Sequence, residues 1–293
     1  MDGLAGSQND SDHREMDLRH AGEHPLAPMV LLVAQLTCLR SPAGDTGNLP
    51  AGSEVKRRMI ERAQWVAREE RAPPYTYEKR WVLERWEGTE ERPKKEEKLY
   101  QVTQIAGFPF NRLLKIQGRE LTAEELKEEQ RREEKFQQRL GSPDARKMAA
   151  RKEGWVTAEL LDRYEFEVRG QTVVSNRSTF VLAFKPRAGS LPMKSIRDKL
   201  LNRLEGILWV DEEEGETRML RANLTETVSL GWFGMLGSLS RCDFALERQR
   251  LASGVWVNRE QVLQIQCRRL ATVLRFRSRE LCRGFKQAAE VDN

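Results

Sequence analysis

Acidic residues gather at one point of the chain, Asp211-Glu-Glu-Glu214, directly before Gly215. Two carboxylates held close together can act as a general acid and a general base. The same composition is typical of a hairpin turn with solvated carboxylates, and we favour that interpretation. All three histidines, His13, His20 and His24, precede residue 25. We therefore predict that the protein is not an enzyme; the alternative is an enzyme that relies on an Asp/Glu pair or on a lone Ser or Cys nucleophile.

The cysteines give no sign of a metal or redox site. Cys38, Cys242, Cys267 and Cys282 are far apart in the sequence and form no CxxC spacing. A zinc site would need more ligands than the folded part of the chain offers, since it has no histidine. We expect buried free thiols that behave as small apolar side chains, and neither a cofactor nor a metal.

An apolar loop, Ser229-Leu-Gly-Trp-Phe-Gly-Met-Leu-Gly237, interrupts a series of strands near the end of the chain. Three glycines disfavour both a helix and a regular strand, yet so apolar a loop must cover something or become covered. We predict that four residues of this loop line or gate a hydrophobic cavity and that two residues on nearby strands lie beside it. These candidate ligand-binding residues are Trp232, Phe233, Met235 and Leu236 in the loop and Trp209 and Phe244 on the strands. The alternative is that all six are ordinary core residues.

The elements that would position this loop follow from the periodicity of apolar residues. Apolar residues recur at helical spacing between Ser53 and Ala72, and Pro73-Pro74 ends that pattern. Residues alternate with period two from Tyr75 to Glu84, and again around Tyr164–Val168 and Phe180–Phe184, as expected for strands. A further short helix is predicted to carry Ile196, Leu200 and Leu204.

A highly charged segment separates the two groups of strands. Thr122-Ala-Glu-Glu125 has the form of a capping box, and it opens a helix predicted to extend to Leu140. The apolar stripe of this helix is thin, so we expect it to protrude or to lie across the domain as a lid.

About ten predicted antiparallel strands with helical interruptions indicate an α+β fold. We expect a curved antiparallel sheet that forms an open half-barrel, with helices packed in its concave side. Residues 45–293 would form this single domain, with a charged helical insert at 119–152.

The first 44 residues are predicted to be a disordered N-terminus that contains a signal peptide. Residues 1–28 show no apolar periodicity, and the apolar run Met29–Leu39 is too short to span a bilayer but has the length of a signal-peptide core. We therefore expect an exported, periplasmic protein. The alternative is a cytoplasmic protein in which Val30–Leu39 is a buried strand or short helix.

The charge of the chain argues against nucleic acid as a partner. Its 50 basic residues are interspersed among 45 acidic ones, with a net charge of +5 and no long basic block. We expect a monomer with a charged, solvated surface.

The order of elements, together with Leu204-Glu-Gly-Ile-Leu-Trp-Val-Asp211 and the segments Phe244–Arg248 and Val255–Val257, resembles the bacterial outer-membrane lipoprotein carrier and receptor superfamily (LolA and LolB like). The likeness extends over residues 53–285. It implies a half-barrel with a helical lid over a hydrophobic cavity, which carries acyl chains through the periplasm without chemistry. This chain departs from the family in its greater length and its charged insert.

These observations predict a non-enzymatic periplasmic binding or carrier protein for a hydrophobic ligand, a lipid or the acyl chains of a lipoprotein. A membrane-associated partner would receive or supply the cargo. The alternative is an interaction or structural protein that uses the charged helical insert as a docking arm and has no ligand cavity.

Overall fold

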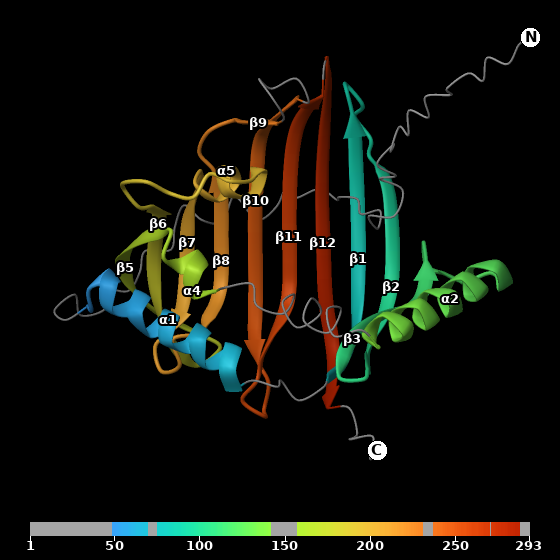
Figure 1. The fold of residues 1–293 in the computed structure, drawn as a ribbon, viewed down its shortest axis with the longest axis horizontal. Coiled ribbons are helices and arrows are strands. Elements are labelled where there is room, and N and C mark those ends of the chain that lie inside the picture. The colour runs from blue at the N-terminus through green and yellow to red at the C-terminus, as the bar shows by residue number, and fades with distance from the viewer. Residues whose placement is uncertain (1–48, 70–74, 142–156, 231–236, 270, 288–293) are drawn as a thin grey trace, which may run out of the picture.

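The computed structural model describes residues 49–69, 75–141, 157–230, 237–269 and 271–287. Within these ranges the chain forms one large antiparallel sheet and a few helices (Figure 1). The helices are α1 (Gly52–Glu69), α2 (Ala123–Leu140), α4 (Ala158–Leu161) and α5 (Ile196–Leu201). The strands are β1 (Tyr75–Glu87), β2 (Lys94–Ile105), β3 (Phe108–Ile116), β4 (Arg119–Glu120), β5 (Tyr164–Val174), β6 (Arg177–Pro186), β7 (Leu204–Asp211), β8 (Thr217–Leu224), β9 (Val228–Leu230), β10 (Gly237–Arg250), β11 (Trp256–Arg269) and β12 (Thr272–Gln287).

The strands follow the order β4-β3-β2-β1-β12-β11-β10-β8-β7-β6-β5, and β9 pairs with β10. The first strand therefore pairs with the last, over a register that runs from Tyr75 opposite Gln287 to Glu87 opposite Leu274. β5 and β4 lie at opposite ends of this order, so the sheet stays open, as the sequence predicted. The four strands in its middle, β1, β12, β11 and β10, are among the longest.

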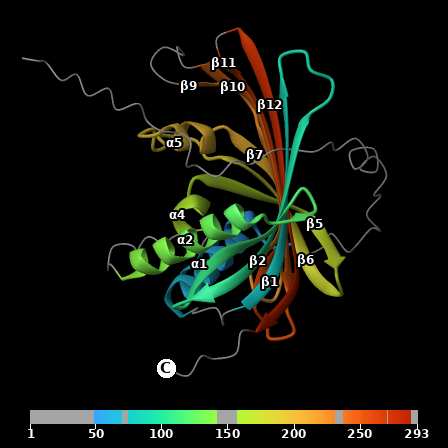
Figure 2. The ribbon, with the colours of Figure 1, turned by 90° about the vertical axis from the view of Figure 1, so that its right-hand side faces the viewer.

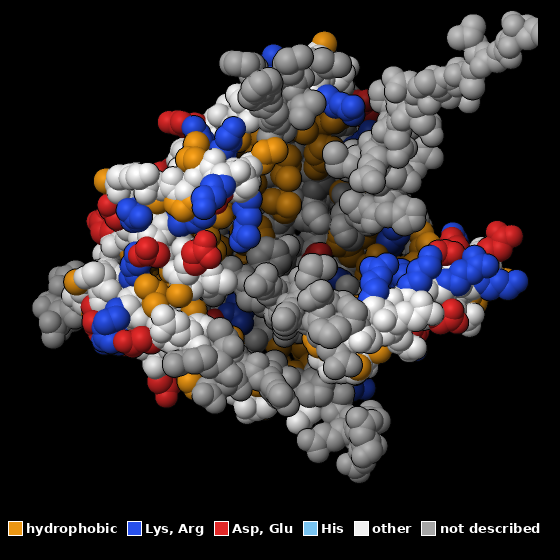
Figure 3. Space-filling view, viewed as in Figure 1, with side chains coloured by type: hydrophobic (Ala, Val, Ile, Leu, Met, Phe, Trp, Pro, Cys, Tyr) orange, Lys and Arg blue, Asp and Glu red, His pale blue; other side chains and the backbone are white. Residues whose placement is uncertain are grey.

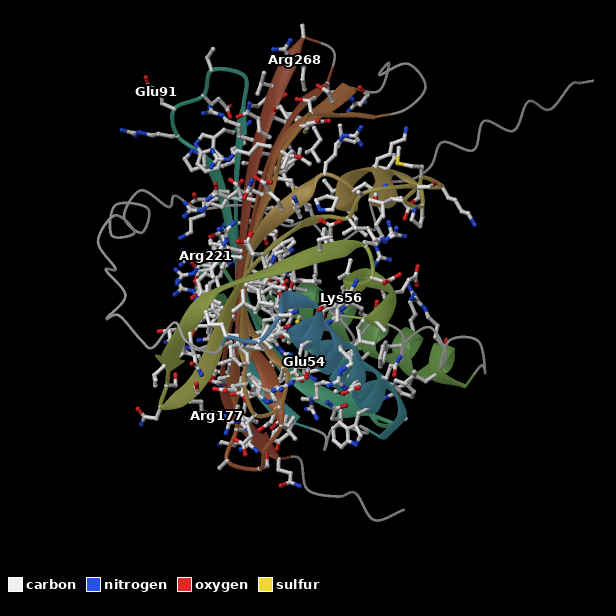
Figure 4. All side chains as sticks on the ribbon, turned by 90° about the vertical axis from the view of Figure 1, so that its left-hand side faces the viewer. Glu54, Lys56, Glu91, Arg177, Arg221 and Arg268 are labelled. Atoms are coloured by element: carbon white, nitrogen blue, oxygen red, sulfur yellow. The ribbon has the colours of Figure 1, made fainter. Side chains whose placement is uncertain are left out.

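The described helices lie on one side of the sheet (Figure 2). We call the face toward α1 and α4 the inner face and the opposite one the outer face. In Figure 4, Glu54 and Lys56 of α1 lie on the inner side and Arg221 of β8 on the outer side.

The main hydrophobic core fixes α1 and α4 on the inner face. Val55 and Met59 of α1 are buried against alternate residues of β6 and β7, among them Leu182 and Leu208. These positions alternate because successive side chains of a strand point to opposite faces. The predicted strand patterns at Phe180–Phe184 and Tyr164–Val168, and the apolar face of the first helix, are thereby confirmed. The prediction that Leu204 belongs to the short helix is wrong, because α5 ends at Leu201 and Leu204 begins β7.

The charged helix α2 lies beside β3, which pairs with the two-residue edge strand β4 at Lys115 and Ile116. Its capping box is confirmed, because Glu125 N–H donates to Thr122 Oγ1 and Thr122 N–H donates to the Glu125 carboxylate. The backbone N–H of Leu113 donates to Glu129 at 2.9 Å, and Arg132 donates to the carbonyl of Asn111. A strand at the edge of a sheet exposes unpaired backbone groups. α2 therefore supplies partners to β3.

Candidate ligand-binding surface

The pairing registers show which residues of the middle strands share the inner face with the core. Phe244 of β10 lies opposite Ala222 of β8, a buried core residue. Phe244 also lies opposite Leu263 of β11, and Leu263 opposite Ser278 of β12. Directly opposed residues of antiparallel strands point to the same face. Leu263 and Ser278 therefore lie on the inner face too.

We call a set of directly opposed residues across β10, β11 and β12 a row, and two more rows cross these strands on the inner face. Cys242, Ile265 and Phe276 form one row, and Leu239, Cys267 and Leu274 form the other. We call the apolar residues of the three rows the central stripe. Its members are Leu239, Cys242, Phe244, Leu263, Ile265, Cys267, Leu274 and Phe276. Beyond Phe244 and Leu263 the next row contains the buried Leu246 of β10, followed by Gln261 and Glu280, so on β11 and β12 the stripe gives way to polar residues at that end.

The central stripe lies between two packed clusters. On one side, Phe244 packs against the main core beneath α1. On the other side, Phe276 packs against a smaller cluster around the buried Trp81 and Leu83 of β1. Among the described residues, Leu239, Leu263, Ile265 and Leu274 belong to neither cluster.

These apolar side chains are only partly shielded. Cys242 is buried, but the other members of the stripe are half-buried. The described helices pack mainly to the sides, with α1 on β5, α2 on β3 and α5 on β9. Hydrophobic side chains reach the surface between them (Figure 3). A contiguous apolar surface between packed clusters makes the stripe the candidate site for an apolar partner.

Of the six predicted site residues, the structure describes Trp209 and Phe244, and these two lie on opposite faces of the sheet. Phe244 lies on the inner face, as part of the stripe. Trp209 lies on the outer face, because its neighbours Leu208 and Val210 point into the core; Arg221 stacks over its ring at 5.7 Å. Trp209 and Phe244 therefore do not line one wall together. Trp232, Phe233, Met235 and Leu236 lie outside the described residues. Their segment joins β9 to β10, whose Leu230 and Gly237 pair beside Leu239.

The three cysteines of the described chain are free thiols, as predicted. Burial raises the pKa of Cys242 and of Cys282 to about 11, and it also raises the pKa of Cys267. A thiol with a raised pKa stays protonated at neutral pH and is a poor nucleophile. No group of three or more metal-binding side chains occurs in the described part of the chain. The thiols of the stripe, Cys242 and Cys267, therefore add apolar surface to it.

The structure corrects the expectation that the carboxylates of the acidic turn, Asp211–Glu214, are solvated. Glu212–Gly215 do form the turn between β7 and β8, but Asp211 is fully buried instead of solvated. Arg177 donates to both of its carboxylate oxygens at 2.6 and 2.8 Å, and Glu214 N–H donates at 3.0 Å. Burial alone would raise the pKa of Asp211, but these hydrogen bonds and the charge of Arg177 bring it below its usual value. Asp211 and Arg177 therefore form a structural ion pair.

A second ion-pair group ties α1 to the sheet. Glu216 is buried and accepts a hydrogen bond from Arg62 of α1 at 2.9 Å and another from Arg248 of β10. Glu214 accepts from the indole N–H of Trp256 at 2.8 Å and from Arg250 at 2.6 Å. The bond from Arg62 to Glu216 therefore stabilises the position of α1 over the inner face, whereas the contacts of Glu214 join the turn after β7 to the end of β10 and the start of β11.

No family model and no curated protein matches the chain. Several solved structures show a distant likeness to it, among them the following three. An outer membrane lipoprotein-sorting domain from Vibrio parahaemolyticus has 8% identity and a TM-score of 0.32, with 83% of this chain and 94% of that chain covered. A DUF1329 family protein from Desulfovibrio piger has 7% identity and a TM-score of 0.29, with 83% and 96% covered.

The third is a LolA superfamily protein from Nitrosomonas europaea, with 9% identity, a TM-score of 0.27, and 82% of this chain and 95% of that chain covered. At these TM-scores the likeness carries no argument about function. The LolA superfamily, which the sequence resembles, is the superfamily named for this third structure.

Proposed function

We propose that the protein is a non-enzymatic binding or carrier protein for a hydrophobic ligand, an acyl chain of a lipid or lipoprotein, and that it binds this ligand along the central stripe. The observation that carries the proposal is the row of half-buried apolar side chains in the middle of the inner face, between two clusters that are already packed. We also propose that the sheet is curved into a half-barrel with helices packed in its concave side.

Desolvation would drive the binding. Each methylene that moves from water to an apolar surface contributes roughly 0.8 kcal/mol, so about half of a lipid chain gives useful affinity. The stripe extends over three strands and three rows, and adjacent strands lie about 4.8 Å apart. It can therefore contact several methylenes at once.

The loop residues Trp232, Phe233, Met235 and Leu236 remain proposed contacts or gates, since their segment starts and ends beside Leu239. Trp209 is not included, because its side chain lies on the outer face. We further propose that the protein is exported to the periplasm and meets a membrane-associated partner there. Among the described residues, no helix is long and apolar enough to cross a membrane.

Native mass spectrometry with lipid extraction tests the proposal. The wild-type protein is expected to carry acyl species after purification from periplasmic expression. Leu263→Glu places a charge in the stripe and should abolish this cargo. The matched control is Val173→Glu, which replaces an apolar residue of β5 that is 69% exposed and remote from the stripe. A wild-type protein free of cargo that also fails to take up a fatty-acyl probe would refute the proposal.

A second candidate function is a docking role for α2. Leu140 is the one buried residue of this helix, and Leu126 is 50% exposed. The helix therefore presents a charged surface with little contact to the sheet. If the protein takes up no acyl probe but captures a partner that is lost on Leu126→Glu, this interaction role replaces the carrier role.

A further inference from the structure

The outer face of the sheet differs in character from the inner one. Arg275, Arg277 and Arg279 occupy alternate positions of β12, and all three point outward because Leu274 and Phe276 point inward. A hollow of about 160 Å³ lies beside them, between β2, β1 and β12. Its wall contains Arg80, Val82, Lys95, Arg279 and Leu281.

The cations around this hollow exceed the carboxylates that pair with them. Arg80 and Lys95 share the carboxylate of Glu97, at 2.8 and 3.3 Å. Arg279 pairs with Glu260 at 2.7 Å. Arg80, Lys95 and Arg279 thus pair with two carboxylates, and the buried Glu84 lies opposite both Lys95 and Arg277 on the same face. With Arg277 counted, four cations face three carboxylates among the described residues, which leaves an excess of one positive charge on this part of the outer face. The cations come from three strands of one sheet, so they are held on a rigid frame.

Arg277 supplies an independent sign that a partner is missing. It is 9% exposed, and its Nη1 atom has no hydrogen-bond partner among the described residues. It lies two residues from Arg279 on the same face and opposite Glu84, a buried carboxyl whose Oε2 also has no such partner. Burial lowers the pKa of Arg277 to about 10 and raises that of Glu84. A buried donor without an acceptor is costly, and charge-assisted hydrogen bonds to an anion would offset that cost.

We propose that this outer-face hollow binds a phosphate-sized oxyanion, either free or as the headgroup of an anionic lipid. Arg80, Lys95 and Arg279 surround the anion, with the aliphatic side chains of Val82 and Leu281 in the same wall. The buried Arg277 lies on the same face two residues from Arg279, outside the lining of the hollow. The inference goes beyond the proposed carrier function, since it concerns the opposite face of the sheet and does not require an acyl ligand on the stripe.

Thermal unfolding of the full chain in increasing inorganic phosphate tests the site, with chloride at matched ionic strength as reference. A ligand that binds the folded state raises the melting temperature in a concentration-dependent way. Arg279→Gln should weaken the phosphate affinity roughly tenfold, because it removes a charge-assisted contact. Lys95→Gln serves as a second variant if Arg279→Gln unfolds.

The matched control is Arg241→Gln. Arg241 is an exposed arginine of β10, also on the outer face and ion-paired to Asp243, but outside the hollow. It should keep the wild-type phosphate response. A phosphate response that is absent, or that is equal in all variants, would overturn the proposal.

Sedimentation with vesicles then separates the two sources of the anion. Binding to phosphatidylglycerol but not to phosphatidylcholine vesicles, competed by phosphate and lost in Arg279→Gln, identifies a lipid headgroup. A site-specific phosphate response without vesicle binding identifies a free anion. The carrier function is tested separately by Leu263→Glu, so failure of one proposal leaves the other intact.

Discussion

Replacing Ile265 by aspartate is a direct test of the central stripe. Ile265 lies in the middle row, opposite Cys242 on one side and Phe276 on the other, and its side chain is half-buried. In the free protein the new carboxylate can keep contact with water, so we expect the variant to fold. With an acyl chain along the stripe the same carboxylate would lose that water.

The expected loss of affinity has two parts. Removing the isoleucine contact costs up to about 1.5–3 kcal/mol, the value for burying such a side chain. Taking a carboxylate out of water without a partner costs several kcal/mol more, although movement of the side chain relieves part of this cost. A total of about 3 kcal/mol or more corresponds to binding that is at least ~100-fold weaker.

Titration of a fluorescent fatty-acyl probe measures this loss. The control is Gln266→Asp, which places the same charge one residue further along β11, on the outer face opposite Arg275 of β12. The melting temperature of both variants is compared with that of the wild type. Equal probe affinity in a folded Ile265→Asp variant and in the control would show that the stripe does not contact the ligand.

Three further predictions concern the frame that holds the stripe. Leu182→Ala should lower the free energy of unfolding by about 2–5 kcal/mol in chemical denaturation, because it leaves a cavity at a fully buried position; a loss below 1 kcal/mol would contradict this. Asp211→Ala should lower it by about 3–5 kcal/mol, because Arg177 loses its buried partner. Because the pKa of Asp211 in the folded protein is below its ordinary value in an unfolded chain, its contribution to stability is present above that ordinary value and is lost as the pH falls through the folded pKa. The acid titration of stability should therefore be shallower in Asp211→Ala than in the wild type. Thr122→Ala should lower stability by roughly 1 kcal/mol if α2 unfolds with the sheet, whereas Thr122→Ser should restore it.

Local patterns in the sequence were sufficient to predict many of the helices and strands. The alternation of Phe180, Leu182 and Phe184 gave a strand and its buried face, and the capping box gave the start of α2 at Thr122. These features depend on neighbours within a few residues, so a single sequence contains them. The series of strands was likewise predicted to be antiparallel, and the strand pairs of the sheet are antiparallel.

The face of a side chain was harder to predict in a continuous apolar segment. Ile207-Leu-Trp-Val210 has no alternation, so the segment does not reveal which residues point to the core. The core takes Leu208 and Val210, and Trp209 is left on the outer face with Arg221. The composition of the acidic turn predicted solvated charge, but Asp211 is buried because Arg177, 34 residues earlier, reaches it.

What the sequence by itself determined was therefore the type of most elements and the openness of the sheet. The tertiary structure alone decided that β1 pairs with β12, and that Leu239, Cys267 and Leu274 lie side by side on three strands. Registers between strands depend on packing over long sequence separations, and a shift of one residue would move every side chain to the other face. The central stripe exists only through those registers.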